Sequence, residues 1–180
     1  NVICLGHILD DKGKKMSKSV GNIVDPWVMA DKYGIDTIRF WMYSVNQPGE
    51  PKSFNEKTVL ELQRQVFNLL YNVLAFYELY PNATPPSNPS PKEREVTQIQ
   101  GSTSDINILD QWILIKLNEL IKLVQGNLDN YKLLEPARAI KDFIEDLSTW
   151  YLRCSRERIK EEGGETLYFI LKNLVKIMAP

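Results

Sequence analysis

Histidine and cysteine are scarce in this chain of 180 residues. His7 is the only histidine, and the two cysteines, Cys4 and Cys154, lie far apart. Because a tetrahedral zinc site takes four Cys or His ligands, usually at close spacing, we expect no metal site in this chain. Two unpaired cysteines suit a reducing compartment, so we expect a cytoplasmic protein.

Long apolar runs and a large excess of charge are also missing. No run approaches the roughly 18 apolar residues of a membrane span, and the first residues lack the organisation of a signal peptide, so we expect no membrane contact. The formal net charge of −1 excludes a generally basic nucleic-acid binder. Any RNA contact must therefore come from a local basic patch. Since the chain has no initiating Met, we expect it to be an internal piece of a longer protein.

The first 54 residues combine turn signals with short regular elements. A β-prone segment from Val2 to Leu9 ends in turn chemistry at Asp10-Asp11-Lys12-Gly13. Asp25-Pro26 predicts the start of a helix, and Gly34 predicts its end. A second short helix is expected from Asp36 to Val45, followed by a loop over residues 47–54.

From Asn55 onward the apolar residues repeat with a helical period. Their steps of three and four over residues 55–80 predict one long amphipathic helix that ends at Pro81. Its inward stripe consists of Val59, Leu62, Val66, Leu69, Val73, Phe76 and Tyr80. Residues 81–104 carry five prolines among their first eleven positions, which predicts a flexible, Pro-rich loop.

Three more amphipathic helices are predicted, over residues 105–130, 135–162 and 165–178. The inward positions of the first are Leu109, Trp112, Ile113, Leu117, Leu120, Val124 and Leu128. Those of the second are Ile140, Phe143, Leu147, Trp150, Tyr151 and Cys154, and those of the third are Leu167, Ile170, Leu171, Leu174 and Ile177. Amphipathic helices without strands between them predict a bundle. The predicted fold is mainly α: a helical bundle over residues 55–180, preceded by a small α/β region over residues 1–54.

The most informative segment is Lys15-Met16-Ser17-Lys18-Ser19. Alone, these five residues would favour a solvated basic turn. The flanks change that interpretation, because Gly13 precedes the segment, Gly21-Asn22 follows it, and Asp25-Pro26 opens a helix just after. The complete string GKKMSKSVGNIVDP resembles the signature loop of the class I aminoacyl-tRNA synthetases almost residue for residue.

This resemblance implies a role in ATP binding. Amino-acid activation displaces pyrophosphate from ATP, and ammonium groups beside the leaving phosphates stabilise the charge that builds there in the transition state. In the family, the second lysine of the motif is the main such cation, which corresponds to Lys18. Lys15 corresponds to the first lysine, Met16 to its apolar anchor, and Ser17 and Ser19 supply hydroxyl donors. ATP is the expected substrate, with Mg²⁺ in the complete enzyme.

The other signature of that class, a HIGH-type motif that holds ATP, is absent. His7 lies in Gly6-His7-Ile8-Leu9, which is the wrong context, and fits a structural residue before the turn. The amino-acid pocket must also lie upstream. We therefore expect the isolated chain to be inactive.

The helical half resembles one group within the class. Residues 142–156 read DFIEDLSTWYLRCSR, which is similar to the DLSNWY-x-RRSR helix of isoleucyl-tRNA synthetases. Residues 109–114, 128–131 and 137–140 resemble helices of the anticodon-binding domain of the same enzymes, and residues 50–59 and 71–73 resemble their long connecting helix. The family's paired arginines are Arg153-Cys154 here, so half of that basic pair is absent.

Four basic side chains of the helical half are candidate tRNA contacts: Arg138, Lys141, Arg153 and Arg156. Arg153 and Arg156 are three positions apart and share a helix face, from which they can pair with RNA phosphates. The alternative is a solvated face or pairing with Glu157 and Asp146. The aromatic side chains Trp112, Trp150 and Tyr151 could stack on bases, but buried helical positions favour a place in the core.

Together these resemblances imply part of an enzyme that activates isoleucine with ATP and transfers it to tRNA(Ile). The expected partners are tRNA(Ile), isoleucine and ATP, and the expected state is a monomer. One alternative is the valine or leucine enzyme of the same class. Another is a non-catalytic helical RNA-binding module derived from a synthetase, which would have no use for an intact phosphate-binding loop.

Overall fold

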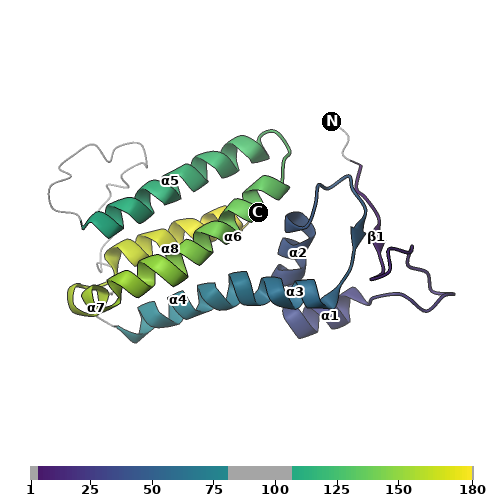
Figure 1. The fold of residues 1–180 in the computed structure, drawn as a ribbon, viewed down its shortest axis with the longest axis horizontal. Helices are drawn as coiled ribbons and strands as arrows, with labels where there is room; N and C mark the ends of the chain where they lie inside the picture. Colours follow the sequence, from purple (N-terminus) through teal and green to yellow (C-terminus); the bar gives the residue numbers. More distant parts are fainter. Residues whose placement is uncertain (1–3, 81–106, 180) are drawn as a thin grey trace.

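The computed structural model describes residues 4–80 and 107–179, and most of these residues are helical. Figure 1 shows a helical bundle that carries a smaller region of short helices and extended chain at one end. The predicted fold class, mainly α with a small α/β part, is confirmed. The Pro-rich loop predicted over residues 81–104 lies outside the described residues.

The β structure of the described part is one parallel pair, β1 (Ile8–Leu9) and β2 (Lys52–Ser53). The backbone N–H of Lys52 donates to the carbonyl of His7 at 2.9 Å, and that of Phe54 donates to Leu9 at 2.8 Å. The predicted β-prone stretch contains β1 at its end. The prediction of a loop over residues 47–54 was wrong, because that segment contains β2. A strand this short is set by backbone pairing and leaves no side-chain periodicity in the sequence.

Two short helices follow the lysine-rich segment, α1 (Pro26–Tyr33) and α2 (Ile35–Ser44). The Asp25 carboxylate accepts a hydrogen bond from the Trp27 N–H at 2.8 Å, and Pro26 occupies the first helical turn. Gly34 has φ 84°, a left-handed conformation that ends α1 and precedes α2. Both predicted helix boundaries are confirmed.

The long helix predicted from Asn55 is confirmed, with one irregularity. It consists of α3 (Glu56–Leu62), a π turn that we call η1 (Gln63–Phe67), and α4 (Asn68–Leu79). The Asn55 side chain caps its start by accepting from the Lys57 N–H at 2.9 Å. Five residues of the predicted stripe are buried, and the other two, Leu69 and Tyr80, are partly buried against the core.

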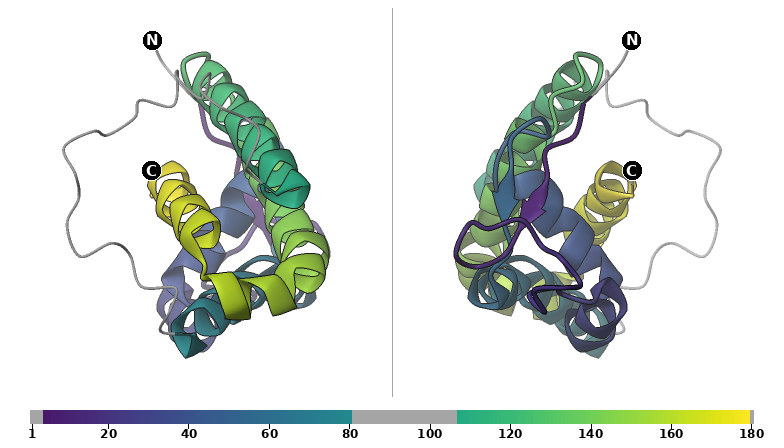
Figure 2. Two further views of the ribbon diagram at one scale, coloured as in Figure 1. Left: turned by 90° about the vertical axis from the view of Figure 1, so that its left-hand side faces the viewer. Right: turned by 90° about the vertical axis from the view of Figure 1, so that its right-hand side faces the viewer.

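The remaining helices are α5 (Ile108–Leu128), α6 (Leu134–Glu145), a second π turn η3 (Asp146–Tyr151), α7 (Leu152–Glu162) and α8 (Glu165–Met178). α6, η3 and α7 are continuous along the chain. In Figure 1 α6 runs across the page whereas α7 is seen nearly end-on, and Figure 2 shows α7 crossing toward α8. The helix therefore bends at η3, as helices commonly do at π turns.

The π turn η3 also overturns two predicted core positions. Trp150 is 54% exposed and Cys154 is exposed, whereas both were expected inside. Leu147 and Tyr151 are buried as predicted, and the inward face continues through Ser155 and Ile159, at steps of four. A π turn holds more residues per turn than an α-helix, so the inward face falls one position later along the chain than a constant α period predicts.

One hydrophobic core joins the two ends of the described chain. Trp41 of α2 is 1% exposed, and its ring meets that of Phe54 edge-on with centroids 5.2 Å apart. Its indole N–H donates to the Thr58 hydroxyl of α3 at 3.0 Å. The same cluster of buried residues continues through α4, α5 and α6 to Leu174 of α8. The small N-terminal region is therefore fixed on the bundle by packing as well as by the chain.

Candidate functional site

The lysine segment is held by the side chain of Asp10, the residue that follows β1. One carboxylate oxygen of Asp10 accepts the backbone N–H groups of Lys12 at 3.0 Å and Lys14 at 2.7 Å. The other oxygen accepts a hydrogen bond from the Asn22 side-chain amide at 2.8 Å. Asp10 thus closes the turn before the motif and reaches the residue that follows it.

Asn22 completes the loop from the other side. Its side-chain oxygen accepts from the Ser17 N–H at 2.8 Å, and its amide also donates to the Lys15 carbonyl at 3.3 Å. We call this pair the Asp10–Asn22 clamp. Neither residue was predicted as functional; the turn chemistry at Asp10 and the Gly21-Asn22 flank were the only signals. The clamp fixes the backbone of the motif without engaging its lysine side chains.

The hydrogen bonds to Asp10 also keep its carboxylate ionised. The Asn22 amide, followed by the Lys14 N–H, lowers the pKa of Asp10 below its ordinary value. A charged carboxylate is the stronger acceptor, so the clamp is at its strongest at neutral pH.

The clamp leaves both motif lysines facing solvent. Lys15 and Lys18 are exposed, and among residues 4–80 and 107–179 no carboxylate lies within ion-pair distance of either ammonium group. Met16 is partly buried against the core, as expected of an anchor, and the Ser17 and Ser19 hydroxyls lie 2.9 Å apart. Gly13 and Gly21 bracket the loop with φ of 74° and 73°. Two unpaired cations and two hydroxyls on a fixed backbone can bind an anion with several oxygens, such as a polyphosphate.

The structure separates the four candidate RNA contacts. Arg138 of α6 donates from its guanidinium to the carbonyls of Val45 at 3.0 Å and Ser44 at 3.3 Å, at the end of α2. Its side chain therefore joins α6 to α2. Lys141, one turn further on, is partly exposed. Arg153 is about four turns beyond Arg138, past the bend at η3, so the four residues do not form one patch.

Arg153 and Arg156 both lie on the surface of α7, in different surroundings. Arg156 is exposed but lies over the ring of Phe76 in α4, 5.4 Å from its centroid. Arg153 is exposed. The carboxylates considered as alternative partners bind elsewhere: Glu157 pairs with Lys160 at 2.8 Å, and Asp146 pairs with Lys116 of α5. Pairing with these two carboxylates therefore does not account for Arg153.

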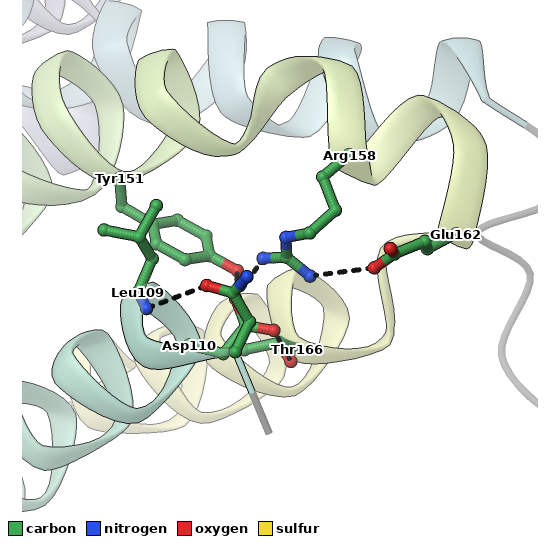
Figure 3. A network of polar contacts seen from close by, with 7 residues as sticks. Leu109, Asp110, Tyr151, Arg158, Glu162 and Thr166 are labelled. Carbon is green, nitrogen blue, oxygen red and sulfur yellow. Dashed lines mark hydrogen bonds and ion pairs between the residues drawn. The ribbon is translucent and has the colours of Figure 1, made fainter. Parts of the chain in front are cut away.

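A buried polar network near α7 was not predicted. Figure 3 shows Asp110 of α5 between Tyr151 of η3, Arg158 of α7 and Thr166 of α8. The Asp110 carboxylate accepts from the Tyr151 hydroxyl at 2.7 Å and the Thr166 hydroxyl at 3.2 Å, and it pairs with Arg158. Burial, together with the adjacent Asp110 carboxylate, raises the pKa of Tyr151 and keeps its hydroxyl protonated. The network fixes α7, which carries the exposed arginines, to two other helices.

The described residues were also searched for a metal site and for a membrane-spanning helix. Within them, no group of three or more His, Cys, Asp or Glu side chains is arranged to hold a metal ion. Along the same residues, no helix has both the length and the apolar character of a membrane span.

Two protein families match the chain. The family described as tRNA synthetases class I (I, L, M and V) matches residues 1–53, which contain the lysine loop. The family described as anticodon-binding domain of tRNA ligase matches residues 110–180, which contain α6, η3, α7 and α8.

Individual relatives agree with these matches. The isoleucine–tRNA ligase of Dehalococcoides mccartyi strain CBDB1 is 40% identical over 100% of this chain, and that of Deinococcus radiodurans is 42% identical over 91%. The chain spans only 18% and 14% of the length of these two relatives.

Solved structures share the fold. The Agrobacterium radiobacter K84 agnB2 LeuRS, crystallised as a ternary complex with tRNA and LeuAMS, superposes with a TM-score of 0.67 at 20% identity, over 98% of this chain and 20% of that one. Mycobacterium tuberculosis methionyl-tRNA synthetase bound by methionyl-adenylate gives 0.65 at 22% identity, over 96% of this chain and 33% of that one. Residues 1–53 of the chain are thus similar to the class I tRNA synthetases and residues 110–180 to the anticodon-binding domain of tRNA ligases, and the two isoleucine–tRNA ligases are similar to it over 91–100% of its length.

Proposed function

We propose that this chain is the part of an isoleucine–tRNA ligase that links the ATP-binding lysine loop to the tRNA-binding helices. The observation that carries the proposal is the clamped loop, whose backbone is fixed by Asp10 and Asn22 while Lys15 and Lys18 remain unpaired and exposed. Residues 1–54 would belong to the catalytic unit, and residues 55–180 to the anticodon-binding unit. The position of the two family matches, 1–53 and 110–180, supports this division.

The chemistry follows from the charge of the loop. In activation, a carboxylate oxygen of isoleucine attacks the α-phosphorus of ATP, and the bond to the bridging oxygen breaks so that pyrophosphate leaves with the electron pair. Negative charge grows on the leaving phosphates, and Lys18, assisted by Lys15, would stabilise it. Ser17 and Ser19 would donate hydrogen bonds to phosphate oxygens, and the partly buried Met16 would fix the loop on the protein.

The loop does not offer ligands for the Mg²⁺ expected in the complete enzyme. The Asp10 carboxylate is already occupied by three donors, and the described residues contain no metal-binding cluster. We therefore assign no step in this chain to a metal ion. Magnesium bound with ATP ordinarily keeps several waters and is held by the substrate phosphates together with one or two carboxylates.

The proposal also covers the partners. The likeness to the anticodon-binding family supports tRNA as a partner, and the isoleucine–tRNA ligase homologues support tRNA(Ile). We propose that the protein acts as a monomer in the cytoplasm, where charged tRNA is used for translation.

The direct test of the lysine loop is Lys18→Ala in the complete ligase. Removing one positioned donor of this kind ordinarily costs about 10²–10³ in rate, so we expect a loss of that order in ATP–pyrophosphate exchange. Lys12→Ala is the matched control, because Lys12 is an exposed lysine of the same loop outside the motif. Unchanged exchange in Lys18→Ala, or an equal loss in the control, would contradict the assignment.

The test of the helical half is binding of this chain to isoleucine, valine and leucine tRNA transcripts at low and physiological salt. We expect preference for the isoleucine tRNA, weakened by Arg153→Ala. Arg156→Ala should also weaken it, with some loss of stability because Arg156 packs on Phe76. Preference for the valine or leucine tRNA would favour those enzymes instead. A non-catalytic RNA-binding module would be indicated if the complete protein bound tRNA but gave no pyrophosphate exchange.

A further inference from the structure

Lys52 is a buried lysine that the lysine motif and the helical bundle leave unexplained. It is 8% exposed, and its ammonium group donates to the backbone carbonyls of Gln47 at 2.9 Å and Asn46 at 3.4 Å. Among the described residues, no carboxylate lies within ion-pair distance of this ammonium group. Burial lowers the pKa of Lys52 below its ordinary value, although the charge of Glu50 acts in the opposite direction. Because a buried cation without a carboxylate partner is costly, stability alone does not account for this residue.

The carbonyls that Lys52 binds belong to residues 46–51, a segment that packs tightly against the chain before β1. The Gly6 N–H donates to the Pro48 carbonyl at 2.8 Å. A β-carbon at Gly6 would lie 2.1 Å from the Glu50 carbonyl oxygen, so this approach of two backbones requires glycine. Lys52 therefore ties the segment to β2, and the same segment lies directly against the chain that enters β1.

The strand β1 lies between β2 and the lysine motif. On one side, β1 pairs with β2 in parallel. On the other side, Leu9 forms an antiparallel bridge with Lys15, the first lysine of the motif. Next to this bridge, the Asp10 N–H donates to the Lys14 carbonyl at 2.8 Å. The backbone position of Lys15 therefore depends on the position of β1, which depends in turn on β2.

We propose that Lys52 is a positioning residue for Lys15 in amino-acid activation. Its ammonium group would fix the segment that leads into β2, β2 would place β1, and β1 would place the backbone of Lys15. The ammonium group of Lys15 would then meet the leaving phosphates at the correct distance. The inference rests on the proposed role of the lysine loop and adds to it a side chain from outside the loop.

The test is Lys52→Met in the complete ligase, followed by ATP–pyrophosphate exchange at a concentration of active sites fixed by titration. Methionine keeps an unbranched apolar chain but has neither the charge nor the donors. Since a displacement of about 1 Å can cost about 100-fold in rate, we expect kcat to fall by about tenfold or more. The value of kcat/KM for ATP should fall equally, because the weakened contact is one made in the transition state.

Two further variants accompany this measurement. Lys52→Arg keeps a charged donor for the two carbonyls and should recover most of the lost kcat. Lys57→Met is the matched control, because Lys57 is an exposed lysine close by in the chain, and its kcat should equal that of the parent.

A double-mutant cycle with Lys15→Ala separates positioning from a general effect on folding. If Lys52 acts through Lys15, Lys52→Met should change kcat by less than about twofold in the Lys15→Ala enzyme, because the ammonium group that it places is already absent. An equal loss in both backgrounds would mean that Lys52 supports the fold without positioning Lys15, and the proposal would be wrong.

The remaining outcomes distinguish this proposal from the proposed function. An unchanged kcat in Lys52→Met would overturn the role of Lys52 and leave the role of the lysine loop intact. If the parent enzyme gave no exchange, or if Lys15→Ala lost no activity, both proposals would fail. Circular dichroism checks the folding of each variant. If Lys52→Met does not fold, Lys52→Gln, which keeps a neutral donor, takes its place in the same cycle and decides the case.

Discussion

At the scale of single residues, the shape of the lysine loop depends on side chains outside the motif. Asp10 binds the backbone before the motif, and Asn22 binds the backbone within it. The lysines need no contact of their own to be positioned. Both ammonium groups are therefore available for a ligand, and binding one would not require an existing ion pair to break.

The clamp can be tested by Asp10→Ala. Because two backbone amides lose their acceptor, hydrogen exchange at Lys12 and Lys14 should become faster, while exchange in the helices stays unchanged. The neighbouring Asp11→Ala is the control, since Asp11 is exposed. An equal effect of the two substitutions would contradict the clamp.

The clamp should also respond to pH in a defined direction. The pKa of Asp10 is lowered from an ordinary value of 3.8, so its contribution is present above that value. It should be lost only as the pH falls through the lower pKa of the folded loop. Exchange rates at the Lys14 amide, followed as the pH is lowered, report this loss.

The sequence predicted the residues of the lysine motif but not the side chains that hold the motif and the helices in place, for a physical reason. Lys15 to Ser19 are contiguous, so the pattern is visible in one short string. Asp10 and Asn22 are 12 positions apart, and Asp110 is 41 positions from Tyr151. Such side-chain pairs are brought together by the folded backbone, and nothing in the local sequence marks them.

At the scale of the elements, Arg138 connects two helices from different parts of the chain. Its guanidinium binds the carbonyls of Ser44 and Val45, which lack intrahelical donors at the end of α2. This contact gives Arg138 a structural role whether or not it also meets RNA.

We expect Arg138→Ala to lower the free energy of unfolding by about 1 kcal/mol, because the carbonyls of Ser44 and Val45 lose a charged donor. Arg138→Lys should recover part of the lost stability, since a lysine ammonium group can donate to one of the carbonyls but lacks the planar guanidinium that donates to both. Lys141→Ala, on the same helix, should stay within about 0.5 kcal/mol of the parent. Urea unfolding of the three variants measures this, and weaker RNA binding without any loss of stability would instead support a tRNA role.

Helix extents were predictable from the sequence, but the helix phase beyond η3 was not. Prolines, glycines and caps mark helix ends, and the ends at Gly34 and Gly163 follow them. The assignment of Trp150 and Cys154 to the core assumed a constant period of 3.6 residues. The π turn interrupts that period, and no residue type within Asp146–Tyr151 indicates that a π turn forms there.

At the scale of the whole molecule, the core does not stop at the change of sequence pattern near Asn55. Trp41, Phe54 and Val59 lie on both sides of that point and belong to one buried cluster. Periodicity reveals where elements begin, but it does not show which elements share a core. The proposed division at residues 54 and 55 is therefore compatible with a single packed unit.

A shared core predicts one cooperative unfolding transition. Trp41→Ala should destabilise the chain by about 3–5 kcal/mol and shift the signals of both regions together, because the cavity opens between α2 and α3. Equal calorimetric and van't Hoff enthalpies in the parent chain would show this cooperativity. The exposed Trp27→Ala should have little effect. Two separable transitions would mean that the regions fold independently.

The π turns η1 and η3 have a consequence for how chain length matters in this molecule. Each turn accommodates one residue more than an α-helix needs, so each is an insertion absorbed without interrupting the helix. A homologue shorter by one residue at either place could form a regular α-helix there and still keep every later side chain on the same face. Alignment of such sequences would require a gap inside a helix. At these two places the helix can therefore accept a difference of one residue while the side chains that follow keep their buried or exposed faces.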